Sequence, residues 1–282
     1  MDLCNIREIK ALLGRHGFHF SKSMGQNFLI AGWVPQDIAD AAGLDKSCAV
    51  LEIGPGIGPL TRQLSLRAGK VAAVELDSSL LPILRETLAD CSNVEVIPGD
   101  IMKLDIGAII SDKFSGFTVK ACANLPYNIT TPVLTKLLEA GCFQSITVMI
   151  QREVARRICA APGDPDCGSF SLFCQYPAQC ELLFEVPPAC FLPAPKVTSA
   201  VVRLTPHAAP PVAGDEGAIF AVVKASFAQR RKTLLNALSA AYGSRFSKEQ
   251  LRQIILACGL PETVRGERLS LEQYAVLASA LH

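Results

Sequence analysis

The feature that most constrains the fold is an alternation of short, β-rich apolar runs with helically spaced segments over the first two thirds of the chain. The first five runs begin about 21 to 28 residues apart, which leaves room for one helix between successive runs. Strands connected in this way form a parallel sheet with crossover helices. We therefore predict a doubly wound α/β sheet with strands at 49–54, 70–76, 94–99, 118–124, 146–150, 181–186 and 197–204. The last two can form an antiparallel hairpin at the sheet edge.

The flanks of this sheet have a different character. The apolar spacing predicts a short helix at 6–13 and helices within 219–238, 248–258 and 271–281, and residues 16–29 read as an ordered loop. A Pro-, Ala- and Gly-rich stretch precedes the C-terminal helices. The predicted organisation is a catalytic-type α/β domain at 1–205, a linker at 206–217 and a small all-helical domain at 218–282.

Composition excludes several classes of protein. Half of the 282 residues are apolar and 19% are charged, which excludes an intrinsically disordered chain. The sequence contains no run of about 18 apolar residues for a membrane helix and no export signal after Met1, so we expect a cytoplasmic protein without membrane contact. The net charge is −2 over 1–206 and +3 over 207–282. Because this surplus is small, nucleic-acid binding must be argued from local groups.

The eleven cysteines do not form a disulfide or metal pattern. Their number is odd, no pair has C-x-x-C spacing, and the four histidines are not interleaved with them. Most lie in apolar runs, as do Cys48, Cys122, Cys142 and Cys174. We expect buried free thiols and no metal.

A glycine-rich turn follows the first predicted strand of the sheet. Gly54, Gly56 and Gly58 have G-x-G-x-G spacing and lead into a helix near Leu60. Glycines at this point let the backbone approach a nucleoside cofactor, so Gly54 and Gly56 are candidate cofactor-binding residues. A dinucleotide site would have G-x-G-x-x-G spacing, and Glu52 before the turn would repel a phosphate. The turn therefore disfavours NAD and FAD.

Two acidic residues follow the next two strands. Glu75 ends the second strand, where a carboxylate can accept hydrogen bonds from both ribose hydroxyls, and Asp100 follows the third, where it can meet the exocyclic amine of adenine. Each acid alone is compatible with a solvated strand end. The ordered set fits adenosine without phosphates, which favours S-adenosylmethionine as the cofactor.

The sharpest chemical signal is Asn124-Leu125-Pro126-Tyr127 at the end of the fourth strand. An amino group on a nucleobase is a poor nucleophile, so a methyltransferase gains by hydrogen-bonding and aligning it. The side-chain oxygen of Asn124 and the backbone carbonyl of Leu125 can accept those bonds. Pro126 stiffens the turn, and Tyr127 can stack on a base turned out of its helix. No metal is required.

With these motifs the chain resembles the small-subunit rRNA adenine N6,N6-dimethyltransferases of the rRNA adenine methylase superfamily. Gly25-Gln26-Asn27-Phe28-Leu29 is similar to the family's N-terminal signature, and the segment from Phe191 to Ser199 is similar to its F-x-P-x-P-x-V-x-S motif. The resemblance implies a Rossmann-like methyltransferase sheet and places Phe191 opposite Tyr127 as a second wall around the target base. The cofactor contacts it implies, with Gln26 added from the signature and Gly56 from the turn, are Gln26, Asn27, Leu29, Gly54, Gly56, Glu75, Asp100 and Asn124.

Two groups of cations are candidate RNA contacts. Arg230, Arg231 and Lys232 lie in a stretch, Phe227 to Asn236, that is similar to the F-x-x-R-R-K-x-L-x-N run of the small-subunit enzymes. Adjacent cations of this kind can bind RNA phosphates or line a solvated helix face. A second group follows the fifth strand at helical spacing and either binds RNA or pairs with neighbouring acids: it consists of Arg152, Arg156 and Arg157.

The resemblance implies dimethylation at N6 of two adjacent adenosines near the 3′ end of 16S rRNA, with a role in small-subunit biogenesis. The expected partner is 16S rRNA or a precursor of the small subunit, and a monomer is expected. One alternative is a large-subunit rRNA dimethyltransferase of the macrolide-resistance type, which usually carries a different helical tail. Another is a non-catalytic ribosome-assembly or transcription factor, which would not need Asn124–Tyr127. A nicotinamide oxidoreductase would need the other glycine spacing.

Overall fold

The structure is a computed structural model of the chain that describes residues 1–21 and 24–281. The chain forms two compact units. The first unit comprises Met1–Ala155 and Cys180–Pro206, and the second comprises Arg156–Gln179 and His207–His282. The sequence-based boundary at 205 did not anticipate that residues 156–179 belong with the C-terminal helices.

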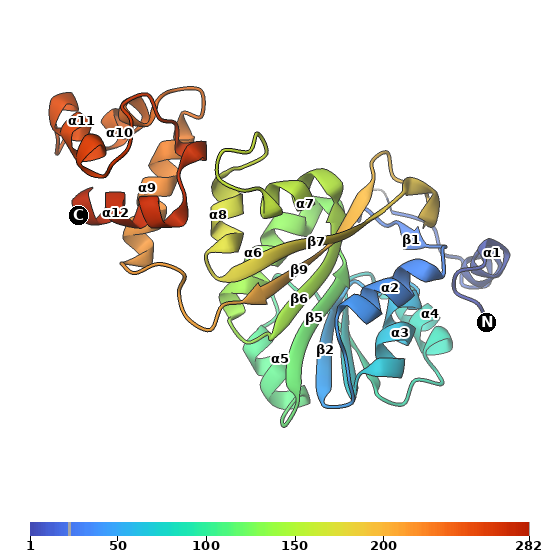
Figure 1. Cartoon of the computed structure of the whole chain (residues 1–282). Coiled ribbons are helices and arrows are strands. Elements are labelled where there is room, and N and C mark those ends of the chain that lie inside the picture. Colours follow the sequence, from blue (N-terminus) through green and yellow to red (C-terminus); the bar gives the residue numbers. More distant parts are fainter. Residues whose placement is uncertain (22–23, 282) are drawn as a thin grey trace. The chain divides into compact units, whose positions relative to one another are not determined.

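The first unit is built on a seven-stranded sheet in the order β4-β3-β2-β5-β6-β9-β7 (Figure 1). The strands from β4 to β6 are parallel, and β9 runs antiparallel to β6. The chain moves outward from β2 to β4 and then returns to the other side of β2 as β5, so the strand order reverses between β2 and β5. A separate antiparallel pair joins β1 to β8. The strands are β1 (Phe28–Leu29), β2 (Cys48–Ile53), β3 (Lys70–Glu75), β4 (Val94–Pro98), β5 (Thr118–Asn124), β6 (Ser145–Gln151), β7 (Ala178–Val186), β8 (Phe191–Leu192) and β9 (Ser199–Pro206).

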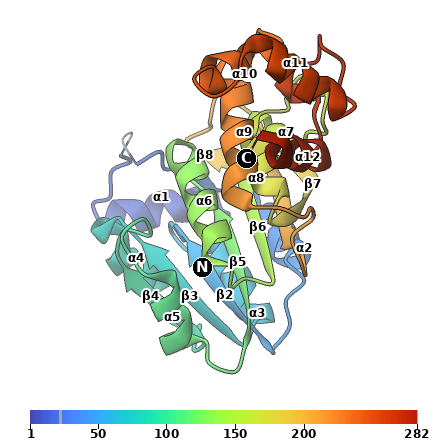
Figure 2. The same cartoon turned by 90° about the vertical axis from the view of Figure 1, so that its left-hand side faces the viewer.

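Helices cover both faces of this sheet. In the two views, α2 and α3 lie on one side and α5 and α6 on the other (Figures 1 and 2). All six residues of β2 are buried, as expected for a central parallel strand covered on both faces. The helices are α1 (Ile6–Arg15), α2 (Trp33–Ala41), α3 (Pro59–Arg67), α4 (Leu81–Thr87), α5 (Ile106–Lys113), α6 (Thr130–Ala140) and α7 (Arg152–Cys159), with 3-10 turns at Ser78–Leu80, Tyr127–Ile129 and Pro188–Cys190.

Local sequence explains where these helices begin and end. The side chains of Asn5 and Asp105 accept backbone N–H groups in the first turns of α1 and α5. Pro59 begins α3, a position where the missing amide hydrogen costs nothing. Gly141 ends α6 with a φ of +61°. Two of these helices, α3 and α5, begin a few residues after the carboxyl ends of β2 and β4.

The second unit is helical and has its own apolar core, which includes Leu172, Tyr176, Leu234 and Tyr274. Its helices are α8 (Ser169–Gln175), α9 (Glu216–Ala228), α10 (Leu234–Tyr242), α11 (Lys248–Ala257) and α12 (Leu271–Leu281), with a 3-10 turn at Gly266–Arg268. The predicted helical segment 219–238 is two helices. The chain breaks at Gln229 and restarts at Thr233, whose hydroxyl accepts the Asn236 amide and caps α10. Apolar periodicity continued across the break because both helices bury a face in the same core.

The predicted doubly wound sheet and the helical C-terminal part are confirmed, and the last two predicted strands are neighbours at one edge of the sheet. All eleven cysteines are free thiols, and Cys48, Cys122 and Cys174 are buried as expected. Cys142 is exposed, which corrects the prediction, because it lies in the turn just after Gly141. Within residues 1–21 and 24–281, none of the helices has the length and apolar character needed to cross a membrane.

Candidate active site

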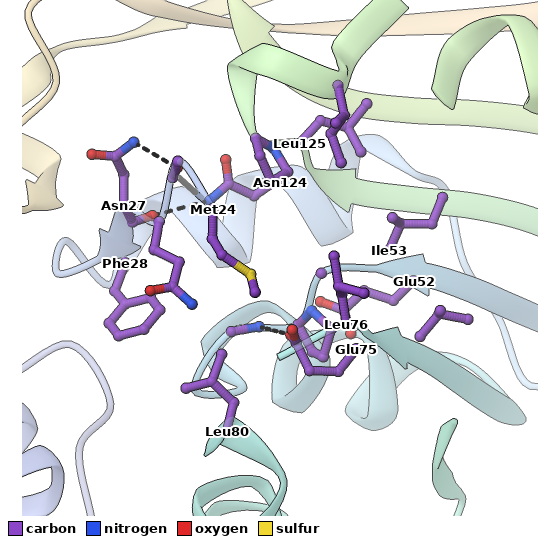
Figure 3. A pocket seen from close by; sticks show the side chains of 18 of the residues that line it. Met24, Asn27, Phe28, Glu52, Ile53, Glu75, Leu76, Leu80, Asn124 and Leu125 are labelled. Carbon is purple, nitrogen blue, oxygen red and sulfur yellow. Dashed lines mark hydrogen bonds between the residues drawn. The ribbon is translucent and has the colours of Figure 1, made fainter. Parts of the chain in front are cut away.

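A pocket of about 280 Å³ opens at the carboxyl ends of β2, β3, β4 and β5, where the strand order reverses (Figure 3). This is the place at which open α/β sheets bind ligands. The sheet brings together in this lining every residue that the sequence marked for cofactor binding or acceptor chemistry. Those residues are Gln26, Asn27, Leu29, Gly54, Gly56, Glu75, Asp100, Asn124, Leu125, Pro126, Tyr127 and Phe191.

The glycine turn forms the floor of the pocket. Gly54, Gly56 and Gly58 have φ values of +68°, +60° and +94°, a region that residues with a Cβ rarely adopt. At Gly56 space is also short, because a Cβ there would lie 3.3 Å from the ring of Phe28. The turn therefore needs glycine for both its backbone conformation and its close contact with the N-terminal loop.

Glu75 ends β3 and is held by backbone amides. One carboxylate oxygen accepts the Asp77 N–H at 2.8 Å and the other accepts the Gly56 N–H at 3.3 Å. Only 6% of the residue is exposed, and burial raises the pKa of its carboxyl. The two amides fix the orientation of the side chain within the pocket lining.

Asp100 lies on the loop that follows β4. Its Oδ1 accepts the Met102 N–H at 2.9 Å, and its backbone carbonyl accepts the amides of Lys103 and Leu104. Its carboxylate is 29% exposed and lines the same pocket as Glu75. The structure therefore groups the two acids at one edge of the sheet, as the motif order predicted.

The N-terminal signature crosses the ends of three strands with three consecutive residues. The Gln26 side chain donates to the Asp77 carboxylate, just after β3, at 2.6 Å. The Asn27 backbone carbonyl accepts a hydrogen bond from the side-chain amide of Asn124, at the end of β5, at 3.4 Å. The Phe28 ring covers the turn at Gly56, which follows β2. Figure 3 shows Asn27 and Phe28 on the left of the pocket and Asn124 at its upper side. These contacts hold the N-terminal loop against the carboxyl ends of the strands. Gln26, expected to bind the cofactor, uses its amide to hold Asp77 and the Ser21 N–H.

Asn124, which is half-buried, ends β5, and Leu125 follows it. Leu125 is buried, and its amide donates to the Met149 carbonyl at 3.1 Å. Because the Asn124 amide nitrogen donates to Asn27, its side-chain oxygen is left as the part of the group that can accept a hydrogen bond. Pro126 accepts bonds from Ile129 and Thr130, which starts the turn into α6.

The two aromatic residues that the sequence predicted for the target base, Tyr127 and Phe191, come from distant segments and both line the pocket. The Tyr127 hydroxyl lies 2.7 Å from the Ser199 hydroxyl, and burial raises the pKa of the tyrosine. Phe191 pairs with Leu29 in the β1–β8 ladder and is only 3% exposed. The structure therefore places both predicted aromatic residues in the pocket lining and ties one of them to the serine that closes the Phe191–Ser199 segment.

Glu52 is the most deeply buried acid of the pocket lining, at 1% exposure. Burial raises its pKa to about 8. Within the part of the chain that the structure describes, its Oε2 has no hydrogen-bond partner. With its pKa raised this far, the carboxyl is mostly protonated and neutral near pH 7. The sequence-based expectation that Glu52 repels a phosphate by its charge is therefore not supported, and the argument against a dinucleotide rests on the glycine spacing.

The candidate RNA-binding cations do not line the pocket. Arg152 is on α7 and pairs with Glu185 at 3.2 Å; Arg156 and Arg157, on the same helix, belong to the second unit. The run at 230–232 lies in the connection between α9 and α10. Arg230 donates to the carbonyls of Pro165 and Cys167 at 2.5 and 3.1 Å, which anchors the loop before α8.

Two features of the pocket were missed by the sequence. Met24 points into it in Figure 3, and its only sequence signal was its place beside the Gly25–Leu29 signature. Ser199 was quoted as the end of a motif but given no role. Across 1–21 and 24–281, no cluster of three or more His, Cys, Asp or Glu side chains is arranged as a metal site.

The fold is that of a Rossmann-like methyltransferase, and its pocket brings Glu75, Asp100 and the Asn124–Tyr127 motif to one switch point. The family model described as ribosomal RNA adenine dimethylase matches residues 17–275. The chain belongs to this ribosomal RNA adenine dimethylase family and is a methyltransferase enzyme.

Similar proteins agree with this assignment. The chain is 47% identical over 270 residues to ribosomal RNA small subunit methyltransferase A of Alkaliphilus metalliredigens, covering 95% of this chain and 94% of that protein. It is 46% identical over 284 residues to the same enzyme of Geobacillus thermodenitrificans, covering 99% and 97%.

Two solved structures are similar over most of the chain. A dimethyladenosine transferase from Plasmodium falciparum has a TM-score of 0.73 and 25% identity, covering 88% of this chain and 95% of its own. The 23S rRNA methyltransferase ErmE has a TM-score of 0.71 and 26% identity, covering 90% and 99%.

Proposed function

We propose that this enzyme uses S-adenosylmethionine to dimethylate, at N6, two adjacent adenosines near the 3′ end of 16S rRNA. The observation that carries the proposal is that one pocket joins the nucleoside-binding acids Glu75 and Asp100 to the acceptor motif at Asn124. A methyl donor and a nucleobase amine need this adjacency, because the transfer requires the two reactants in line.

The residues of the pocket fit S-adenosylmethionine. Its ribose and adenine need acceptors at the ends of β3 and β4, where Glu75 and Asp100 lie. The turn at Gly54 and Gly56 offers a backbone surface without Cβ atoms. The sulfonium of the bound cofactor supplies an activated methyl group. The predicted absence of a metal stays a prediction.

The acceptor chemistry rests on Asn124 and Tyr127. The amide orientation set by Asn27 lets the Asn124 oxygen accept a hydrogen bond from the adenine amine, together with the Leu125 carbonyl. Tyr127, oriented by Ser199, and Phe191 form the walls on which the adenine stacks. The amine loses its proton after or late in methyl transfer, when it has become acidic, so no strong base is needed.

Dimethylation places a further demand on this site. In the second round the amine already bears one methyl group and keeps only one hydrogen for bonding. The pocket must therefore hold the base through stacking as well as through Asn124 and Leu125. Four transfers complete the modification of two adenosines.

We assign RNA binding to residues 218–282 together with the cations of α7, with 206–217 as the linker and 1–205 as the catalytic part. Arg231 and Lys232 are exposed in the α9–α10 connection, where cations can reach RNA phosphates. Arg152, Arg156, Arg157 and Arg230 complete the proposed contacts; for Arg230, the loop carbonyls are competing partners.

The small subunit is the favoured substrate because relatives that are 44–47% identical over nearly the whole chain carry small-subunit names. A cytoplasmic location, a monomeric state and a role in small-subunit biogenesis belong to the same proposal. The likeness to ErmE, a 23S rRNA methyltransferase, supports large-subunit RNA as the second candidate substrate.

The proposal is tested by incubating the enzyme with labelled S-adenosylmethionine and, in parallel, unmethylated small subunits or large-subunit RNA. Digestion and mass analysis then identify the methylated nucleosides. We expect N6,N6-dimethyladenosine from the small subunit alone. Label in large-subunit RNA alone would favour the second candidate, and no label in either would favour an assembly factor on the same fold.

A further inference from the structure

The loop that carries Asp100 is weakly supported by the sheet. It joins β4 to α5, and β4 is the end strand, with a neighbour on one side only. Residues 99–105 contain no helix or strand. A loop in this position needs side chains from elsewhere if it is to present a carboxylate in one orientation.

Lys136 supplies such support from another element. Its ammonium group, on α6, donates to the Met102 carbonyl at 3.0 Å and to the Leu104 carbonyl at 2.7 Å. The Met102 amide in turn donates to the Asp100 carboxylate at 2.9 Å. A chain of hydrogen bonds therefore runs from Lys136 through the loop backbone to Asp100.

The same helix begins at the acceptor motif. The Pro126 carbonyl accepts the Ile129 amide at 3.2 Å and the Thr130 hydroxyl at 3.3 Å, which fixes the start of α6 to the turn after Asn124. Lys136 lies near the middle of α6, between Thr130 and Ala140. Thus α6 is bonded at its start to the turn after Asn124 and, through the Lys136 side chain, to the loop at 99–105.

We propose that Lys136 is a positioning residue for the adenine of the cofactor, acting through the Met102 and Leu104 carbonyls to hold Asp100. This inference rests on the proposed use of S-adenosylmethionine. The lysine does not line the pocket itself, so its effect is transmitted by the loop. Its loss is expected to weaken cofactor binding and to leave the chemical step largely intact.

The test compares Lys136→Met with the wild type and with Asp100→Ala. Calorimetry gives the Kd for S-adenosylhomocysteine and for 5′-methylthioadenosine, which keeps the adenosine but lacks the amino-acid part. Since charge-assisted hydrogen bonds are lost, we expect both Kd values to rise about five- to twentyfold in Lys136→Met. The KM for S-adenosylmethionine should rise similarly, with kcat at saturation within about twofold of the wild type.

Lys103→Met is the matched control. It removes a positive charge from the same loop, but Lys103 is 84% exposed and lies 4.0 Å from the Asp100 carboxylate. Its Kd values should stay within about twofold of the wild type. Lys136→Arg retains donors for the carbonyls and should recover most of the affinity; it also serves if Lys136→Met does not fold.

Distinct results overturn the two proposals. Wild-type protein that binds neither probe would contradict the proposed cofactor. Wild-type protein that binds both, with affinity lost in Asp100→Ala and unchanged in Lys136→Met, would overturn the role of Lys136 alone. An equal loss in Lys103→Met, or no recovery in a folded Lys136→Arg variant, would also overturn it.

Discussion

The sequence predicted functional residues both in the pocket at the strand ends and in the basic run at 230–232. In the structure the two regions differ in how their side chains are held. In the pocket, residues distant in sequence fix one another, as Asn27 does for Asn124 and Ser199 for Tyr127. In the basic run all three residues are exposed, but only the Arg230 side chain is seen to anchor a loop, by donating to the carbonyls of Pro165 and Cys167 within the described residues.

The two regions differ because sheet topology positions the residues of the pocket, whereas local packing positions those of the basic run. The carboxyl ends of parallel strands must meet at one edge, so residues that follow them converge wherever the sheet forms. No such rule fixes neighbouring cations in a loop, whose partners depend on the segments that pack nearby.

Asn124→Ala should lower kcat for adenine methylation by roughly 100- to 1000-fold in both rounds, because a preorganised acceptor of the amine is lost. Single-turnover assays with unmethylated and with monomethylated substrate measure the two rounds separately. Gln144→Ala removes an exposed amide side chain that precedes β6 and does not line the pocket, so it is the control and should lose far less. Normal turnover in Asn124→Ala would contradict the role of this residue.

Glu52→Gln tests the buried floor of the pocket. With its pKa raised to about 8 in the folded protein, wild-type Glu52 keeps a proton that the unfolded chain has released above its ordinary value of 4.5. Wild-type stability therefore falls as pH rises through this window, and the glutamine variant escapes that loss. The free energy of unfolding of the variant relative to wild type should increase by roughly 1–4 kcal/mol from pH 5 to pH 8.5.

Urea denaturation at both pH values measures the difference in free energy of unfolding between variant and wild type, called here the stability gap. Glu139→Gln, at an exposed position on α6, is the control for loss of a carboxylate, and its stability gap should be the same at both pH values. A constant gap for Glu52→Gln would show that the side chain is ionised in the folded protein throughout.

Arg231→Glu should weaken RNA binding about tenfold, a change of about 1.4 kcal/mol, while the Kd for S-adenosylhomocysteine stays unchanged. Filter binding at fixed salt gives the RNA affinity. Lys248→Glu, an exposed cation that begins α11, is the matched control and should weaken binding less. If both ligands were lost together, misfolding would be the cause.

Arg230→Met tests whether Arg230, unlike Arg231, contributes to stability. Its hydrogen bonds to the Pro165 and Cys167 carbonyls predict a loss of stability of about 1 kcal/mol, which Arg231→Met should not show. Thermal denaturation of the two variants measures this difference. Equal stability of both would mean that the anchoring of the loop does not separate the two arginines.

Ser199→Ala and Tyr127→Phe remove the same hydrogen bond from its two sides. Each should lower kcat about two- to tenfold by loosening the ring, and the double variant should be no worse than the more impaired single variant. Steady-state kinetics of the four proteins form the cycle. Additive losses would show that the two side chains act independently.

Much of this architecture could be predicted from the sequence because its causes are local. Apolar runs at regular spacing predicted the sheet, the glycine spacing predicted the turn at 54–58, and the acids at 75 and 100 were found because each follows a strand. The helical segment at 219–238 was not resolved into two helices, because both bury residues in one core and the periodicity continues across the break.

The amino-acid sequence alone specifies which chemical groups follow the strands and in what order, and parallel topology brings those groups to one site. The partners of those groups, in contrast, depend on how the chain packs in three dimensions. Gln26 binds Asp77, Lys136 binds the carbonyls at 102 and 104, and Arg230 binds a loop some 65 residues away in sequence. Such contacts depend on packing between segments that no local pattern relates, so they become visible only when the chain is folded.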